Sequence, residues 1–189
     1  MQSTPRQPAS SDWADDILHF WFEELGPERW FSKDQQLDER IRAQFLQTYE
    51  QLRSGVPGDA TQTARGSLAA VIVLDQFPRN MFRNSPQSFA TDILALSIAQ
   101  QAIARSLDRE LSDQQRTFLY LPFEHSEDRA MQARAVELFS VLGNANYLDY
   151  ARRHKAVIDR FGRFPHRNVM LGRASSAEEL EFLRQNPGF

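Results

Sequence analysis

The chain has 189 residues and a formal net charge of −3, and 41% of its residues are hydrophobic. These values are typical of an ordinary globular protein and provide no overall positive charge to attract nucleic acid or a membrane surface. The absence of cysteine excludes disulfides, thiol nucleophiles and thiolate metal sites. Arginine outnumbers lysine by twenty to two, a bias that suits bidentate binding of carboxylate or phosphate but that a GC-rich genome would also produce.

The two parts of the chain differ in composition. Residues 1–11 are rich in Pro, Ser and Gln and have no apolar core, so we expect a disordered lead-in and not a signal peptide. Residues 12–189 are long enough to bury a core as one domain. No segment approaches the length of a transmembrane span, and we expect a cytoplasmic protein.

Helical periodicity predicts about eight helices and no strand. The first three are expected at residues 12–25, 33–53 and 68–77. Residues 68–74 are all apolar, which indicates a helix buried on every side. The β-branched residues in this segment would also suit a strand, but no second strand-like segment is present to pair with it.

Capping residues delimit the later helices. Ser112 and Gln115 form a predicted capping box, and we expect the helix that they open to end at Pro122. Ser126 is the predicted N-cap of the following helix. The later helices are expected at 85–107, 112–121, 126–142 and 146–161, with a short last helix from Ser176.

Three of the predicted helices end in proline beside aromatic residues. The breaks are at Pro78, Pro122 and Pro165, which are 44 and 43 residues apart. Stacked helical hairpins produce periods of this size, and alternate helices in such a stack run parallel. We therefore predict that the three breaks lie at one end of the stack, although chance could supply this spacing in a chain with nine prolines.

Polar residues around the three breaks form the candidate ligand-binding site. They are Asp75, Arg79, Asn80 and Arg83 at the first break, Glu124 and His125 at the second, and Arg163, His166, Arg167 and Asn168 at the third, together with His154 on the helix that precedes it.

Several of these residues also have a structural interpretation. Asp75 lies on the buried helix, where an ionised carboxylate needs a partner; it is either half of a buried ion pair with an arginine or a site carboxylate that orients that arginine. His154 is either a core residue or a base kept neutral by burial. His125 and His166 lie at helix ends, where a functional role is easier to support. Arg163 and Arg167 follow the end of a helix, and we assign them to an anion.

Other chemistries lack their motifs. No two of the candidate ligands His125, His154, His166 and Glu124 share a helix at the i,i+4 spacing of a metal motif, so we predict neither metal nor cofactor. A Gly-x-Ser-x-Gly nucleophile elbow is also absent. The aromatic residues fall at core spacing and not on a basic surface, which argues against nucleic-acid binding.

Six segments together resemble the bacterial family known as domain of unknown function 924. They are residues 17–22, 30–34, 74–80, 89–92, 118–128 and 160–168, among them Leu74-Asp75-Gln76-Phe77-Pro78-Arg79-Asn80. The resemblance covers residues 15 to 184. It implies an all-α, tetratricopeptide-like fold built as a stack of antiparallel helical hairpins, and it implies no established activity, substrate or catalytic residue.

The sequence favours a helical domain with an Arg/His/Glu pocket that binds a small anionic molecule or a peptide carboxylate. Hydrolysis or another acid–base reaction by His125 and Glu124, with Arg79 and Arg167 holding the anion, is the activity to test. The alternative is an interaction module without catalytic activity that binds a helix or tail of a partner protein. A deep polar pocket favours the first hypothesis, and a long open groove favours the second.

Overall fold

Every regular element between residues 12 and 187, the range that this computed structural model describes, is helical. The α-helices are α1 (Asp12–His19), α2 (Gln35–Ser54), α3 (Ala64–Val71), α4 (Phe77–Met81), α5 (Asp92–Ala104), α6 (Asp113–Glu124), α7 (Arg129–Leu142), α8 (Ala145–Phe161) and α9 (Ala177–Gln185). The all-α prediction is confirmed. The predicted lead-in, residues 1–11, lies outside the described residues.

Two π-helical segments extend or join these helices. Phe20–Leu25 continues α1, and Ile72–Gln76 connects α3 to α4 without a break. With these joined, the described range contains eight helical units, as expected. Four short 3-10 turns complete the elements, at Ala60–Gln62, Pro86–Phe89, Leu107–Glu110 and Pro165–Arg167.

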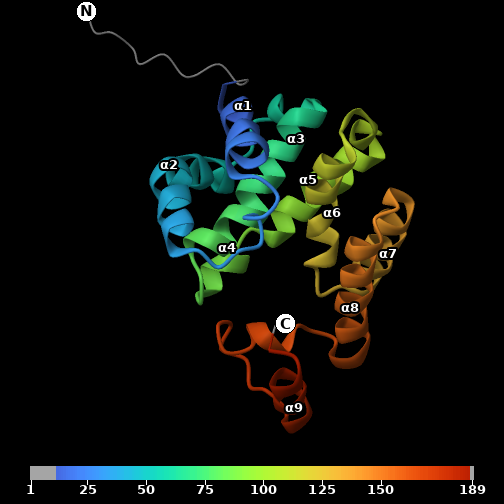
Figure 1. The fold of residues 1–189 in the computed structure, drawn as a ribbon. Helices are drawn as coiled ribbons and strands as arrows, with labels where there is room; N and C mark the ends of the chain where they lie inside the picture. The colour runs from blue at the N-terminus through green and yellow to red at the C-terminus, as the bar shows by residue number, and fades with distance from the viewer. Residues whose placement is uncertain (1–11, 188–189) are drawn as a thin grey trace, which may run out of the picture.

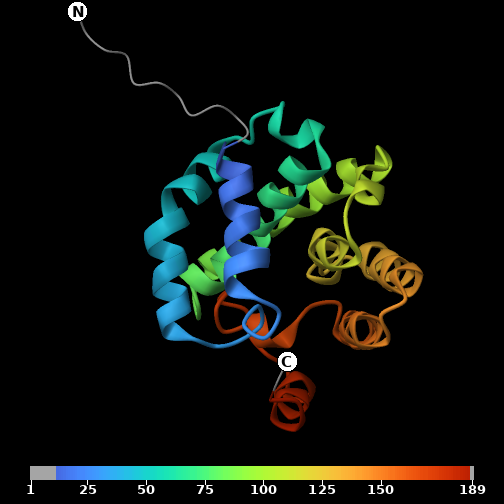
Figure 2. The same ribbon diagram turned by 45° about the horizontal axis from the view of Figure 1, so that its top comes forward.

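Successive helices pack side by side. α6 contacts α7 and α7 contacts α8, and the three are seen nearly end-on together in Figure 2. α9 lies apart from them, beyond the loop that follows α8 (Figure 1). This arrangement is compatible with a tetratricopeptide-like stack, which stays a prediction. No helix within the described range is long and apolar enough to cross a membrane.

Aromatic packing and the central helix form the main core. Leu68 to Leu74 are fully buried, which confirms a helix enclosed on all sides. Phe118 of α6 packs edge-on against Trp21 and Trp30, with ring centroids 5.5 and 4.8 Å apart. Trp30 also donates a 2.7 Å hydrogen bond to the carbonyl oxygen of Trp21, so the loop after α1 is tied to the core.

The predicted helix ends at two prolines are wrong. The helix runs through Pro78 to Met81, and α6 runs through Pro122 to Glu124. Proline cannot donate to the carbonyl of the preceding turn, so that carbonyl needs another donor. At Pro78 the hydroxyl of Thr91 donates to the carbonyl oxygen of Leu74 at 2.5 Å. A tertiary contact therefore supports the continued helix.

The predicted N-cap of α7 is also displaced. Asp128, and not Ser126, accepts hydrogen bonds from the backbone N–H groups of the first turn, at 2.8 and 3.0 Å. Ser126 lies in the preceding turn, where the side-chain amide of Gln132 donates to its carbonyl oxygen at 2.6 Å and to that of Glu124 at 2.6 Å. The buried amide thus holds residues 124–128 in a tight turn outside the helix.

Candidate functional site

The three proline-containing segments meet in space. His125 Nδ1, after Pro122, lies 2.8 Å from Asp75 Oδ1, before Pro78. Arg167, after Pro165, donates to the carbonyl oxygen of His125 at 3.0 Å. These contacts confirm the prediction that the segments lie together, and they define the candidate site.

Two carboxylates and two guanidinium groups form a buried ion network at this junction. Asp75 has no exposed surface, and its carboxylate lies 3.3 Å from Arg79 Nη1. Arg79 also donates hydrogen bonds from both of its terminal nitrogens to the carboxylate of Asp92, at 2.9 and 3.0 Å. Arg167 contacts the same Asp92 carboxylate at 3.2 Å. Asp92 was not predicted as a site residue; the signal was its place in the segment 89–92 that carries the family resemblance.

Asp75 fixes the tautomer of His125, while burial and the charge of Arg79 keep the imidazole neutral. Burial raises the pKa of Asp75, but the positive charge of Arg79 and the contact with His125 outweigh it and lower that pKa to about 2. Burial and the charge of Arg79 lower the pKa of His125, so its imidazole is neutral at neutral pH. Because an ionised carboxylate only accepts hydrogen bonds, the proton lies on Nδ1 and Nε2 is left as the acceptor.

Arg167 is a desolvated cation. The residue is 6% exposed, and its guanidinium carbon lies 4.5 Å from the ring centroid of Phe89 and 4.7 Å from that of Phe164. Burial, with repulsion from Arg79, lowers its pKa to about 10, so it remains charged at neutral pH. Its buried Nε has no hydrogen-bond partner within the described part of the chain.

Arg79, His125 and Arg167 line one cavity of about 390 Å³, within the size range of small-molecule sites. Its walls come from α4, the 3-10 turn that ends at Phe89, the turn after α6, the middle of α8, the turn at Pro165 and the residue after α9. The lining residues are Arg79, Phe89, His125, Tyr150, Arg153, His154, His166, Arg167 and Asn186. Five of the predicted site residues are among them.

Glu124 and His154 form a second titratable pair at the cavity wall. His154 Nδ1 lies 3.2 Å from Glu124 Oε1 and 2.9 Å from the carbonyl oxygen of Tyr150. Burial, with repulsion from Asp75, raises the pKa of Glu124 to about 8. Burial lowers the pKa of His154 to about 4 and that of His166 to about 3. At neutral pH the carboxyl is therefore largely protonated and both imidazoles are neutral.

Six predicted site residues do not line this cavity. Asp75 and Glu124 contact the lining residues His125 and His154, and the other four have partners elsewhere. Asn80 and Arg83 both donate to Asp38 of α2, each at 2.8 Å. Arg163 Nε donates to Glu179 of α9 at 2.7 Å, so the acid that pairs with it comes from a later helix. Asn168 is buried and bonds to two residues of the following loop, Arg173 and Ser175.

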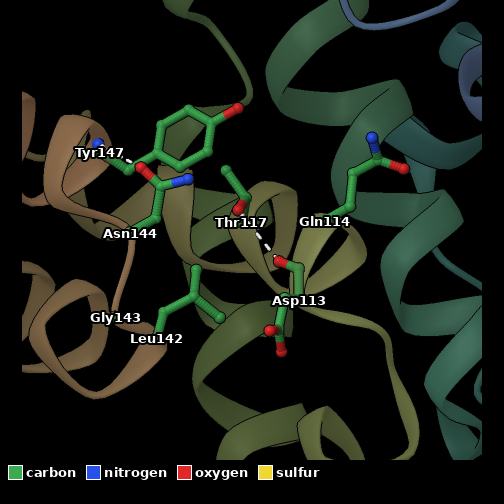
Figure 3. Close-up of a pocket in the computed structure, with 7 residues that line it drawn as sticks. All are labelled: Asp113, Gln114, Thr117, Leu142, Gly143, Asn144 and Tyr147. Carbon is green, nitrogen blue, oxygen red and sulfur yellow. Dashed lines mark hydrogen bonds between the residues drawn. The ribbon is translucent and has the colours of Figure 1, made fainter.

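A separate cavity of about 390 Å³ lies where α6 begins and α7 meets α8 (Figure 3). None of the predicted site residues lines it. The dashed contacts in Figure 3 belong to helix ends: Thr117 donates to the carbonyl oxygen of Asp113 at 3.0 Å, and the Asn144 side chain accepts from the N–H of Tyr147 at 3.2 Å. Across residues 12–187, no three His, Asp or Glu side chains are grouped to hold a metal ion.

Comparison with known proteins identifies the family. The model of the family described as bacterial protein of unknown function (DUF924) matches residues 17–187. The chain belongs to this family. A solved structure of one protein of unknown function, ATU0120 from Agrobacterium tumefaciens, is 40% identical to this family member, with a TM-score of 0.90 over 94% of this chain and 99% of that one. No curated protein sequence shows significant similarity to the chain described in this structure.

Proposed function

We propose that the protein binds a small anionic molecule, or the terminal carboxylate of a peptide, in the cavity lined by Arg79 and Arg167, and that His125 carries out an acid–base step on the bound ligand. The observation that carries this proposal is the Asp75–His125 pair at the wall of the cavity that Arg167 also lines. The proposal requires no metal or cofactor, and it concerns a dissolved ligand of the cytoplasm and not nucleic acid or membrane.

Arg167 supplies the anion-binding group. Its guanidinium lies close to two aromatic rings and is shielded from water, which strengthens a charge-assisted hydrogen bond to a ligand. The lowered pKa of Arg167 reflects both its burial and the repulsion from Arg79. Asp92 already accepts hydrogen bonds from both guanidinium groups, so the N–H group at Nε of Arg167, which has no partner within the described residues, is the donor left for a ligand.

His125 supplies the proton-transfer group. Its Nε2 would take a proton from a water molecule, whose oxygen adds to a carbonyl carbon of the ligand; the bond to the leaving group then breaks, and the proton passes to that group. Glu124 retains a proton at neutral pH and contacts His154. Two neighbouring carboxyl groups whose pKa values lie far apart, those of Asp75 and Glu124, are a pattern typical of acid–base sites.

The lining of the cavity also favours this proposal over the interaction module. Arginine and histidine side chains dominate it, whereas a groove for a partner helix presents mainly apolar residues. A protein partner stays the competing hypothesis.

A thermal-shift screen against carboxylates, phosphates and peptides with free carboxyl ends tests the proposal. A ligand at a hundred times its Kd stabilises the folded state by about 2.7 kcal/mol, which raises the Tm by roughly 5–10 °C for a chain of this length. Arg167→Gln should abolish that shift, and His125→Gln should retain binding but lose turnover.

Arg83→Gln is the control, because Arg83 is likewise an arginine paired with an aspartate but lies outside the cavity lining. It should bind ligand as the unmodified protein does. Equal ligand shifts in Arg167→Gln and the unmodified protein would refute the proposal. Unfolding of both site variants near room temperature would show that these residues are structural instead.

A further inference from the structure

A second cavity, of about 460 Å³, shares a wall with the proposed site. Phe89, His125 and Arg167 line both cavities. The Phe89 ring lies 4.5 Å from the guanidinium carbon of Arg167 and 5.8 Å from that of Arg79. The two cavities are therefore neighbours, and a ligand held at Arg167 can extend into the second one.

The acidic groups of the second cavity already have partners within the protein. Asp92 is shared by Arg79 and Arg167, and Glu127 is paired with Arg173 at 2.7 Å. Asp128 caps α7 by accepting from two backbone N–H groups. The carboxylates in this wall therefore stabilise the fold and are not available to a ligand.

Most of the remaining lining is apolar. The apolar residues are Phe89, Ile93, Leu96, Pro122 and Leu171, and the others are Ser126 and the shared His125 and Arg167. Ile93 is 85% exposed and Leu171 is 38% exposed, so neither belongs to the core. A ligand segment that covered them would bury apolar surface that the protein leaves in water.

We propose that the second cavity is an apolar subsite, and that the ligand is an anion with an aliphatic chain, such as an alkyl carboxylate or alkyl phosphate. The anionic group of the ligand binds at Arg167. Its aliphatic chain passes Phe89 and lies against Ile93, Leu96 and Leu171. This inference rests on the proposed function, because Arg167 anchors the ligand in both.

The test is a series of straight-chain carboxylates and alkyl phosphates of two to eight carbons, measured by isothermal titration calorimetry. A fully buried methylene strengthens binding about fourfold, and in this partly open cavity we expect roughly twofold to fourfold for each one. In the double variant Ile93→Ser, Leu171→Ser, the dependence on chain length should be lost, while the two-carbon anion should bind as it does to the unmodified protein.

Val141→Ser is the matched control, since Val141 is also 85% exposed but lies on α7 and lines neither cavity. It should retain the full dependence on chain length. Affinity that is constant along the series would overturn the apolar subsite and leave the proposed anion site intact. If affinity still depends on aliphatic chain length in the double variant, the ligand's aliphatic chain lies elsewhere and the proposed subsite is overturned. Failure of every compound to bind the unmodified protein would overturn the subsite and the anion site together.

Discussion

Replacing Asp75 by alanine tests whether the buried carboxylate organises the candidate site. The substitution removes the acceptor for the side-chain amide of Gln76, at 2.5 Å, and for Nδ1 of His125, at 2.8 Å. Each buried donor left without a partner costs about 1–3 kcal/mol. Breaking a buried ion pair costs about 3–5 kcal/mol when the remaining charge is isolated. Arg79 is not isolated, because Asp92 still accepts from both of its terminal nitrogens. We therefore expect a loss of about 3 kcal/mol, at the low end of that range.

Urea and thermal unfolding followed by circular dichroism measure this loss. For a chain of this length, about 3 kcal/mol lowers the Tm by roughly 6–12 °C. Asp75→Asn is the control: it keeps the shape and one acceptor and so isolates the effect of charge. A Tm for Asp75→Ala within about 1 °C of the unmodified protein would refute the reasoning.

The acid dependence of stability gives a second readout. The pKa of Asp75 is about 2 in the folded protein against 3.8 for the free side chain. A lowered pKa means that the carboxylate contributes its stability above the higher value and that this contribution is lost as the pH falls toward the lower one. The unmodified protein should therefore lose stability between about pH 4 and pH 2, and Asp75→Ala should lose less over the same interval. An equal loss in both proteins would contradict the assignment of that interval to Asp75.

Three further predictions concern Glu124 at the candidate site and two positions elsewhere in the fold. Glu124 has a pKa raised from 4.5 to about 8, so stability should fall by about 3–5 kcal/mol as the pH rises between these values; Glu124→Gln should flatten that dependence in urea titrations, and an unchanged slope would contradict it. A Cβ at Gly66 would lie 1.8 Å from the carbonyl oxygen of Ala60, so Gly66→Ala should cost about 2 kcal/mol or more, whereas Gly55→Ala, with open space around it, should leave the Tm nearly unchanged. Ser176→Ala removes the capping box of α9 and should cost about 1 kcal/mol, seen as faster hydrogen exchange in α9 alone; unchanged exchange there would show that the cap is not needed.

Local sequence determined the helices, because their signals involve residues only a few positions apart. The predicted capping box at Ser112 is present, and the helix predicted from Ser176 also opens with a capping box. Gly143 and Gly162 end their helices with φ angles of 78° and 70°, in the left-handed region that glycine adopts without a steric penalty. The continuous apolar segment 68–74 likewise required burial on every side, because it has no polar face to turn toward water, whichever other helices cover it.

Tertiary structure decided which charges are paired and which helices continue. Asp75 is 50 residues from His125 in sequence, and Arg163 is 16 residues from Glu179. No local pattern encodes either pair, and the sequence assigned Arg163 to an anion for that reason. The helix continues past Pro78 where Thr91, 17 residues from Leu74, supplies a donor to the carbonyl of Leu74. The shifted pKa values of Asp75 and Glu124 arise from burial and from neighbouring charges, and both quantities exist only once distant segments of the chain have packed together.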